Sequence, residues 1–289
     1  TTTPLLDDGR HNDGLAADGL FAAILPAHTN GTLVEFHLTA TDAAGHSRTV
    51  PTVLGSFTNR SPWFIYQVDD AVVTAQPVYH LVASAEERAY LEKEVWSGSP
   101  LSDARINGTF IATDGLVTDE GSPQVRYLAG FRNRGHGTRY DSPHNIRVDL
   151  PNDNRWRKRT GINLNSQSTP LQNLGSGVFR ALGIPIAESV RVQLRWNSQN
   201  LAGTNAPQWG GYAANEVIDG DLVARQVPQD PDGNLYQGVR DFNTAITPNL
   251  AWHGTDPAGY TNAYFKENHS LANDWSDLIR LIDVLNNTP

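Results

Sequence analysis

The stretch Phe131 to Leu150, FRNRGHGTRYDSPHNIRVDL, places a glycine-flanked, arginine-rich turn between two runs of alternating apolar residues. Backbone N–H groups in such a turn can face phosphate oxygens, and arginine side chains can neutralise them. The same composition is typical of a tight turn with exposed polar side chains. A phosphate-binding loop would usually be followed by a lysine on the next strand, and here that place holds His144. Phosphate binding is therefore one hypothesis, and a plain turn is its alternative.

A second group of candidate ligands lies in the first twenty residues. The segment LDDGRHNDGLAADGL repeats Asp-Gly at Asp8, Asp13 and Asp18. Carboxylates at this density can hold Ca²⁺ through oxygen ligands, although the spacing is not that of an EF-hand loop. Asp-Gly is also a common tight-turn pair. Calcium binding and simple turns both remain open at this point.

Other charged groups have weaker patterns. The basic cluster RWRKR, Arg155 to Arg159, could receive phosphate or an anionic glycan, but a solvated loop is the favoured interpretation. Glu216 and Asp219 stand three apart at the end of an expected strand and could serve acid–base or metal chemistry. The sequence has no His-Glu-x-x-His motif, no Gly-x-Ser-x-Gly motif and no Walker loop, so the corresponding hydrolase and P-loop classes lack support.

The amino-acid composition narrows the classes of molecule that the protein could bind. Lys and Arg number 22 against 31 Asp and Glu, which gives a net charge of −9 and argues against nucleic acid as a partner. The absence of Cys excludes disulfides and thiolate chemistry. No apolar run approaches the roughly 18 residues of a membrane span. The chain has no Met, even at position 1, and is rich in Asn, Thr and Gly, so we expect a piece of a secreted bacterial protein.

Alternating apolar residues predict strands in residues 1–62. The segment LVEFHLTATD alternates Val34, Phe36 and Leu38 with polar residues, and Asn-Gly and Gly turns lie on either side of it. The pattern predicts a small β-sandwich module over residues 1–62.

The remainder, residues 63–289, mixes strands and helices. Ser84 and Glu87 form a capping box. Val125, Tyr127, Ala129 and Phe131 share one expected face of a strand that pairs with NIRVDL, and STPLQNLGSGVFRALGIP predicts a helix that ends at Gly183. The last helix is expected to begin near Asn273. Together these segments predict an α+β domain.

Several segments, in this order, resemble one family. They are FRNRGHGTRY, INLNSQ, VFRALGIPIAESVRVQLRWN, GGYAANEVIDGDLV, GNLYQG and YFKENHSLANDWSDLIRLIDVLN. This ordered set resembles the CotH family of secreted, atypical kinase-like proteins, which is named after a spore-coat protein kinase. The resemblance covers most of residues 63–289, and residues 1–62 look like the extracellular Ig-like module that often precedes such domains.

The resemblance implies a kinase-like N-lobe, an antiparallel sheet plus helices, that binds ATP and Mg²⁺. The implied cofactor-binding residues are Arg134, Gly135, His136, Gly137, Arg139, His144 and Glu216. His144 aligns with the family's lysine, and a neutral imidazole supplies far less charge than an ammonium group. The family's catalytic and metal-binding aspartates lie beyond the DLIRLIDVLN helix, so we do not expect this chain alone to catalyse phosphoryl transfer.

The expected function is that of a secreted bacterial surface protein of the CotH type, which phosphorylates surface proteins with ATP. Its expected partners are other surface or coat proteins. The alternative is a non-catalytic structural or adhesive component of an extracellular assembly.

Overall fold

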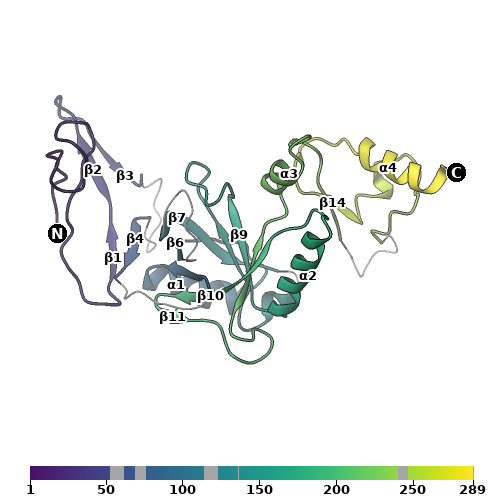
Figure 1. Ribbon diagram of the computed structural model, residues 1–289, viewed down its shortest axis with the longest axis horizontal. Helices are drawn as coiled ribbons and strands as arrows, with labels where there is room; N and C mark the ends of the chain where they lie inside the picture. The colour runs from purple at the N-terminus through teal and green to yellow at the C-terminus, as the bar shows by residue number, and fades with distance from the viewer. Residues whose placement is uncertain (53–61, 69–75, 114–122, 136, 240–246, 289) are drawn as a thin grey trace.

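A closed barrel of seven strands forms the centre of the molecule (Figure 1). The computed structural model describes residues 1–52, 62–68, 76–113, 123–135, 137–239 and 247–288. In order around the barrel, the strands are β5 (Val78–Val82), β6 (Ile106–Thr113), β7 (Gln124–Asn133), β8 (Ile146–Asp149), β9 (Gly161–Asn165), β12 (Tyr212–Glu216) and β10 (Ser189–Trp196). All neighbours are antiparallel except β10 and β5, whose parallel pairing closes the barrel. The short strand β11 (Gln199–Asn200) pairs back onto β10.

The prediction of an Ig-like sandwich followed by a kinase-like N-lobe was wrong. The N-terminal strands form two separate two-stranded sheets instead of two packed layers. One joins β1 (Leu33–Phe36) to β4 (Phe64–Gln67), on the far side of residue 62, and the other joins β2 (Leu38–Thr41) to β3 (Ser47–Val50). The sheet that was expected to be a kinase lobe closes on itself. Closure depends on the pairing of Val78 with Gln193, a long-range contact that local alternation cannot reveal.

Alternation of apolar and polar residues fills the barrel interior. Ile146 and Val148 of β8 point inward, as do Val192 and Leu194 of β10, and all four are at most 1% exposed. Because successive side chains of a strand face opposite sides, the polar residues between them lie on the outside. Trp156, from the loop between β8 and β9, also fills the interior and meets the rings of Tyr79 and Phe110 edge to face. The barrel is therefore a packed core.

An irregularity in β7 changes which residues face inward. Ala129 and Phe131 are fully buried, but Tyr127 lies on the opposite side of the sheet from the face predicted for it. Leu128 has a φ of 58°, and the register with β6 shifts between Gly108 and Phe110. A bulge of this kind exchanges the two faces of a strand. Tyr127 consequently packs outside the barrel, against Phe36 at 5.6 Å and Phe64 at 5.5 Å between ring centroids, and joins the sheet of β1 and β4 to the barrel.

The helices lie at the ends and outside of the barrel (Figure 1). Helix α1 (Ala85–Tyr90) begins where the capping motif predicts, since Ser84 accepts a hydrogen bond from the Glu87 N–H at 3.2 Å. It continues as a π-helical turn, η1 (Leu91–Trp96). The other helical segments are η2 (Gly137–Tyr140), α2 (Thr169–Ala181), α3 (Gly220–Gln226), η3 (Pro257–Gly259) and α4 (Ser276–Asn287). Within the described residues, every helix is too short or too polar to cross a membrane.

The C-terminal part has an apolar core of its own. Strands β13 (Tyr236–Gly238) and β14 (Tyr264–Lys266) pair, and α4 packs beside them. The buried residues of this core are Tyr260, Ala263, Tyr264, Trp275, Leu278, Ile279 and Ile282. The C-terminal part is therefore held together separately from the barrel interior.

Candidate functional site

A row of polar side chains crosses the outside of the barrel. Arg132 of β7 pairs in register with Arg147 of β8, Arg147 with Asn163 of β9, and Asn163 with Asn215 of β12. Beside this row lies an open cavity of about 650 Å³. We call it the arginine cleft, after the four arginines in its wall, Arg132, Arg134, Arg139 and Arg147.

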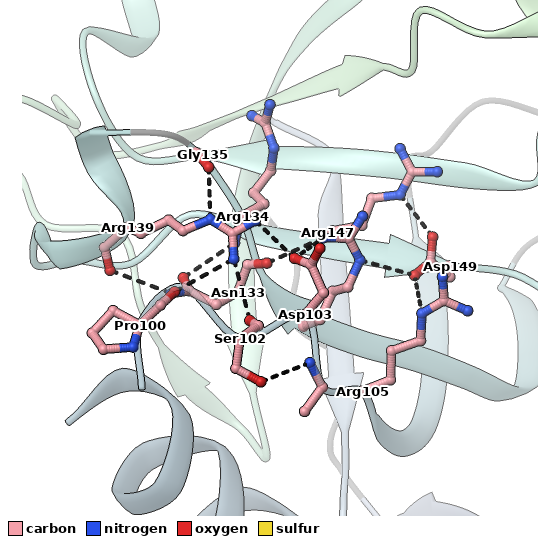
Figure 2. A network of polar contacts seen from close by, with 12 residues as sticks. Pro100, Ser102, Asp103, Arg105, Asn133, Arg134, Gly135, Arg139, Arg147 and Asp149 are labelled. Atoms are coloured by element: carbon pink, nitrogen blue, oxygen red, sulfur yellow. Dashed lines mark hydrogen bonds and ion pairs between the residues drawn. The ribbon is translucent and has the colours of Figure 1, made fainter. Parts of the chain in front are cut away.

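Two aspartates beside the arginine cleft pair with several of its arginines. Asp103 pairs with Arg132 at 2.9 Å and with Arg139 at 2.7 Å. Asp149 pairs with Arg147 at 2.8 Å, with Arg132 at 3.4 Å and with Arg105, behind the cleft, at 2.9 Å. Figure 2 shows these contacts as one connected network. With Arg134 included, five guanidinium groups share these two carboxylates. Glu216 and Glu267 also lie in the cleft wall, so the arginines exceed the carboxylates by one.

Arg134 is the arginine whose charge is least compensated. Among the described residues it forms no ion pair, and its guanidinium donates to the side-chain oxygen of Asn165. Burial, and then the neighbouring guanidinium groups of Arg147, Arg132 and Arg139, lower the pKa of Arg134 to about 10. A half-buried cation beside like charges and an open cavity is in a suitable position to bind an anion.

The turn after β7 is fixed from inside the protein. Gly135 has a φ of 112°, a conformation that favours glycine, and its carbonyl accepts a hydrogen bond from Arg139 at 2.7 Å. Arg139 also donates to the carbonyl of Ser102 at 3.2 Å. The side chain of Arg139 therefore ties the turn to the chain after η1 (Figure 2).

The residues that the resemblance assigned to a cofactor are only partly brought together. Arg134, Gly135, Arg139 and Glu216 line the arginine cleft, whereas Gly137 and His144 are not part of its wall. His136 lies outside the described residues. That these residues bind a cofactor stays a prediction. The structure gives the positions of their side chains.

His144 has a packing role. Its ring stacks on Trp96 with centroids 4.2 Å apart and planes inclined by 17°. Burial lowers the pKa of His144, so its imidazole is neutral at pH 7. A neutral ring stacked on tryptophan does not supply the charge of the lysine that the resemblance places there.

Glu216 and the RWRKR cluster take part in ion pairs. Glu216 is 4% exposed, pairs with Arg225 and with Arg159 at 3.4 Å, and accepts from the Glu188 N–H at 3.2 Å. Arg155 pairs with Asp221 at 2.9 Å. These contacts tie strand ends and loops together, and they leave Glu216 no free oxygen facing the cleft.

The aspartates near the N-terminus hold turns together. Asp13 is 2% exposed and accepts from the N–H groups of Asp8, Gly9 and His11 at 2.5 to 3.1 Å. Asp18 accepts from Leu15 and Leu20, both at 2.9 Å. Within the described part of the chain, no group of three His, Cys, Asp or Glu residues could hold a metal ion. Calcium binding by Asp8, Asp13 and Asp18 stays a prediction, which a melting curve of the full chain with and without EDTA tests.

Several residues of the cleft were missed at the sequence level. They are Arg132, Arg147, Asn163, Asn165 and Gln172. A usable signal was present, because Arg132 and Arg147 occupy the polar positions of two strands that the sequence pairs correctly. Asn165 and Gln172 give no such signal, since they meet only because α2 packs against β10 and β12.

Comparisons with known proteins do not assign the chain to a class. No protein-family model matches it, and no curated protein matches it either. The arginine cleft is therefore the basis for a functional proposal.

Proposed function

We propose that the arginine cleft binds the phosphate groups of a nucleoside triphosphate, and that the chain is the nucleotide-binding part of a secreted phosphoryl-transfer protein of the CotH type. The observation that carries the proposal is Arg134, a half-buried guanidinium with no carboxylate partner among the described residues, which lies beside three other guanidinium groups at an open cavity. An anionic ligand would supply the missing counter-charge. The resemblance to CotH proteins also supports the proposal, because Arg134, Gly135, Arg139 and Glu216 of the residues that it implies line the cleft.

The cleft has the size and charge for such a ligand. Its volume of about 650 Å³ lies within the range of small-molecule sites. Polyphosphate oxygens carry several negative charges, and planar guanidinium groups can bind them in a bidentate manner. The net charge of −9 keeps other polyanions, such as nucleic acids, away from most of the surface.

The proposal assigns no Mg²⁺ ligand and no catalytic residue. Mg²⁺ supplies charge neutralisation in phosphoryl transfer. Near the cleft, Asp149 pairs with three arginines through both of its oxygens and Asp103 pairs with two through Oδ1, so arginines compete with a metal ion for these carboxylates. The role of this chain is limited to binding and orienting the phosphates.

Calorimetric titration of the full chain with inorganic triphosphate and with ATP tests the proposal. Arg134→Gln is expected to weaken both affinities at least tenfold, because a charge-assisted contact is lost. The matched control is Arg155→Gln in the RWRKR cluster, which should leave both affinities unchanged. Equal binding by native protein and Arg134→Gln would contradict the proposal, and a loss confined to Arg155→Gln would move the site to that cluster.

A non-catalytic role in assembly is the second candidate function. It is favoured by the apolar side chains that α2 exposes, among them Leu171 at 69%, Leu174 at 64% and Leu182 at 69%. Exposed apolar patches of this kind mark interaction surfaces. Failure of the titration, together with self-association that Leu174→Glu abolishes in sedimentation experiments, would favour this role.

A further inference from the structure

The helix α2 faces the barrel with amide side chains, and these reach Arg134. Gln172 lies at the centre of this contact. Its side-chain oxygen accepts from the amide nitrogens of Asn165 at 2.8 Å and Asn215 at 2.5 Å. Its own nitrogen donates to the backbone carbonyl of Gln167 at 2.6 Å. Asn165 in turn accepts from Arg134, so a continuous chain of hydrogen bonds runs from α2 to the arginine cleft.

The two ends of this chain require the same direction for every bond, because the carbonyl of Gln167 can only accept and the guanidinium of Arg134 can only donate. A backbone carbonyl can only accept, so Gln172 must present its NH₂ group to Gln167. The side-chain oxygen of Gln172 must then face Asn165, and Asn165 must donate to it from its own NH₂ group. This leaves only the oxygen of Asn165 toward Arg134, the one orientation in which the amide attracts a guanidinium group.

We propose that Gln172 is a positioning residue of the arginine cleft: by fixing the amide orientation of Asn165, it holds the guanidinium of Arg134 in place for an anion. This inference rests on the proposed function, because it concerns the same site. Gln172 does not need to touch the ligand. Without the Gln172 amide, the NH₂ group of Asn165 loses its acceptor and only the bond from Arg134 holds the Asn165 side chain, so the pair of side chains loses its fixed position.

Titration of full-length variants with inorganic triphosphate at low ionic strength tests this role. Gln172→Met keeps the length of the side chain and the helix propensity but removes the amide. It is expected to weaken triphosphate binding about tenfold, the size of effect typical for residues that orient a ligating group. The matched control is Leu174→Ala, which shortens a side chain of the same helix that is 64% exposed and lies outside the cleft wall, and should change the affinity less than twofold.

A double-mutant cycle separates positioning from a general loss of structure. If Gln172 acts through Arg134, Gln172→Met has no further effect in the Arg134→Gln background, where residual binding is measured. An equal loss in both backgrounds would overturn the role of Gln172, as would unchanged affinity in Gln172→Met while Arg134→Gln still loses binding. In both cases the proposed function stands. If native protein does not bind triphosphate, both proposals fall. Gln172→Ala replaces Gln172→Met if circular dichroism shows that the methionine variant is unfolded.

Discussion

Helices α2 and α4 are both amphipathic and almost equal in length, with 13 and 12 residues, yet they turn opposite faces toward the protein. Helix α4 buries Leu278, Ile279 and Ile282 against the aromatic residues of the C-terminal core. Helix α2 turns its polar side inward, where Thr169 and Ser176 are buried. Its apolar side chains, Leu171, Leu174, Val178, Phe179 and Leu182, are between 46% and 69% exposed.

The difference shows two ways of holding a helix. Apolar burial stabilises α4 in proportion to the area removed from water. Helix α2 is held by directional bonds, among them Ser176 to the carbonyl of Ala187 at 2.8 Å and Thr169 to that of Gln208 at 2.6 Å. Such bonds add little net stability but fix orientation. Helix α2 thus buries little apolar surface and places a polar face of fixed orientation beside the arginine cleft. A binding site that depends on the position of Arg134 requires such a rigid support.

The largest expected effect tests the apolar anchoring of α4. Ile282 is 0% exposed, so Ile282→Ala leaves a cavity and should lower the free energy of unfolding by about 3 kcal/mol. Leu174→Ala in α2 removes a similar side chain that is 64% exposed, and should change it by less than about 0.5 kcal/mol. Urea unfolding of both variants measures the difference. Similar costs would mean that the apolar side of α2 is covered in solution and that the contrast between the helices is false.

The amphipathic pattern explains what the sequence could and could not predict here. Helical spacing identifies an apolar stripe in both helices, and both helices form where their patterns place them. The stripe does not say what covers it, because that depends on partners far away in the chain. Similarly, alternation identifies the pairing of β7 with β8, but the closing pair β10–β5 joins segments more than a hundred residues apart. For this reason the strands were predictable, whereas the barrel was not.

The residues of the arginine cleft also divide into those that the local sequence identifies and those that only long-range packing brings to the site. Arg134, Gly135 and Arg139 were identified from a local turn, since turn chemistry is written in neighbouring residues. Gln172 was not, because its role depends on a helix that packs beside two other strands. His144 was assigned to the cleft by alignment with a lysine, but its position is decided by the ring of Trp96. Long-range packing thus decides which polar residues become a site.

A prediction of intermediate size concerns the effect of Arg134, in the arginine cleft, on the stability of the protein. Because burial and its arginine neighbours disfavour the charge of Arg134, Arg134→Gln should raise the free energy of unfolding of the ligand-free chain by about 1–2 kcal/mol. Below the folded-state pKa of about 10 the group is charged in both folded and unfolded chains, so the gain should be equal at pH 7 and pH 9. Above pH 10 the folded chain releases the proton first, so the gain shrinks as the pH rises. Urea unfolding at these pH values measures it, and a destabilised variant would mean that Arg134 is structural.

The smallest expected effect concerns the charged contact at the start of α4. Burial alone would raise the pKa of Asp277, but hydrogen bonds from Tyr236 at 2.5 Å and Asn234 at 2.8 Å outweigh it and lower the pKa below 3.8. A carboxylate with a lowered folded-state pKa stabilises the protein above its unfolded-state pKa, and this contribution is lost as the pH falls through the folded-state value. Asp277→Asn should therefore cost about 0.5–1 kcal/mol at pH 7, since charge-assisted bonds are replaced by neutral ones.

Unfolding of native protein and Asp277→Asn across the acid range gives the readout. The two curves should approach each other only below about pH 4, where the native carboxylate becomes protonated. Asp283→Asn is the matched control on the same helix, because Asp283 bonds only the side chain of Asn287 among the contacts the structure gives it. A gap that does not change with pH would contradict the charge-based explanation, whereas curves that coincide at every pH would show that α4 is held by its apolar face alone.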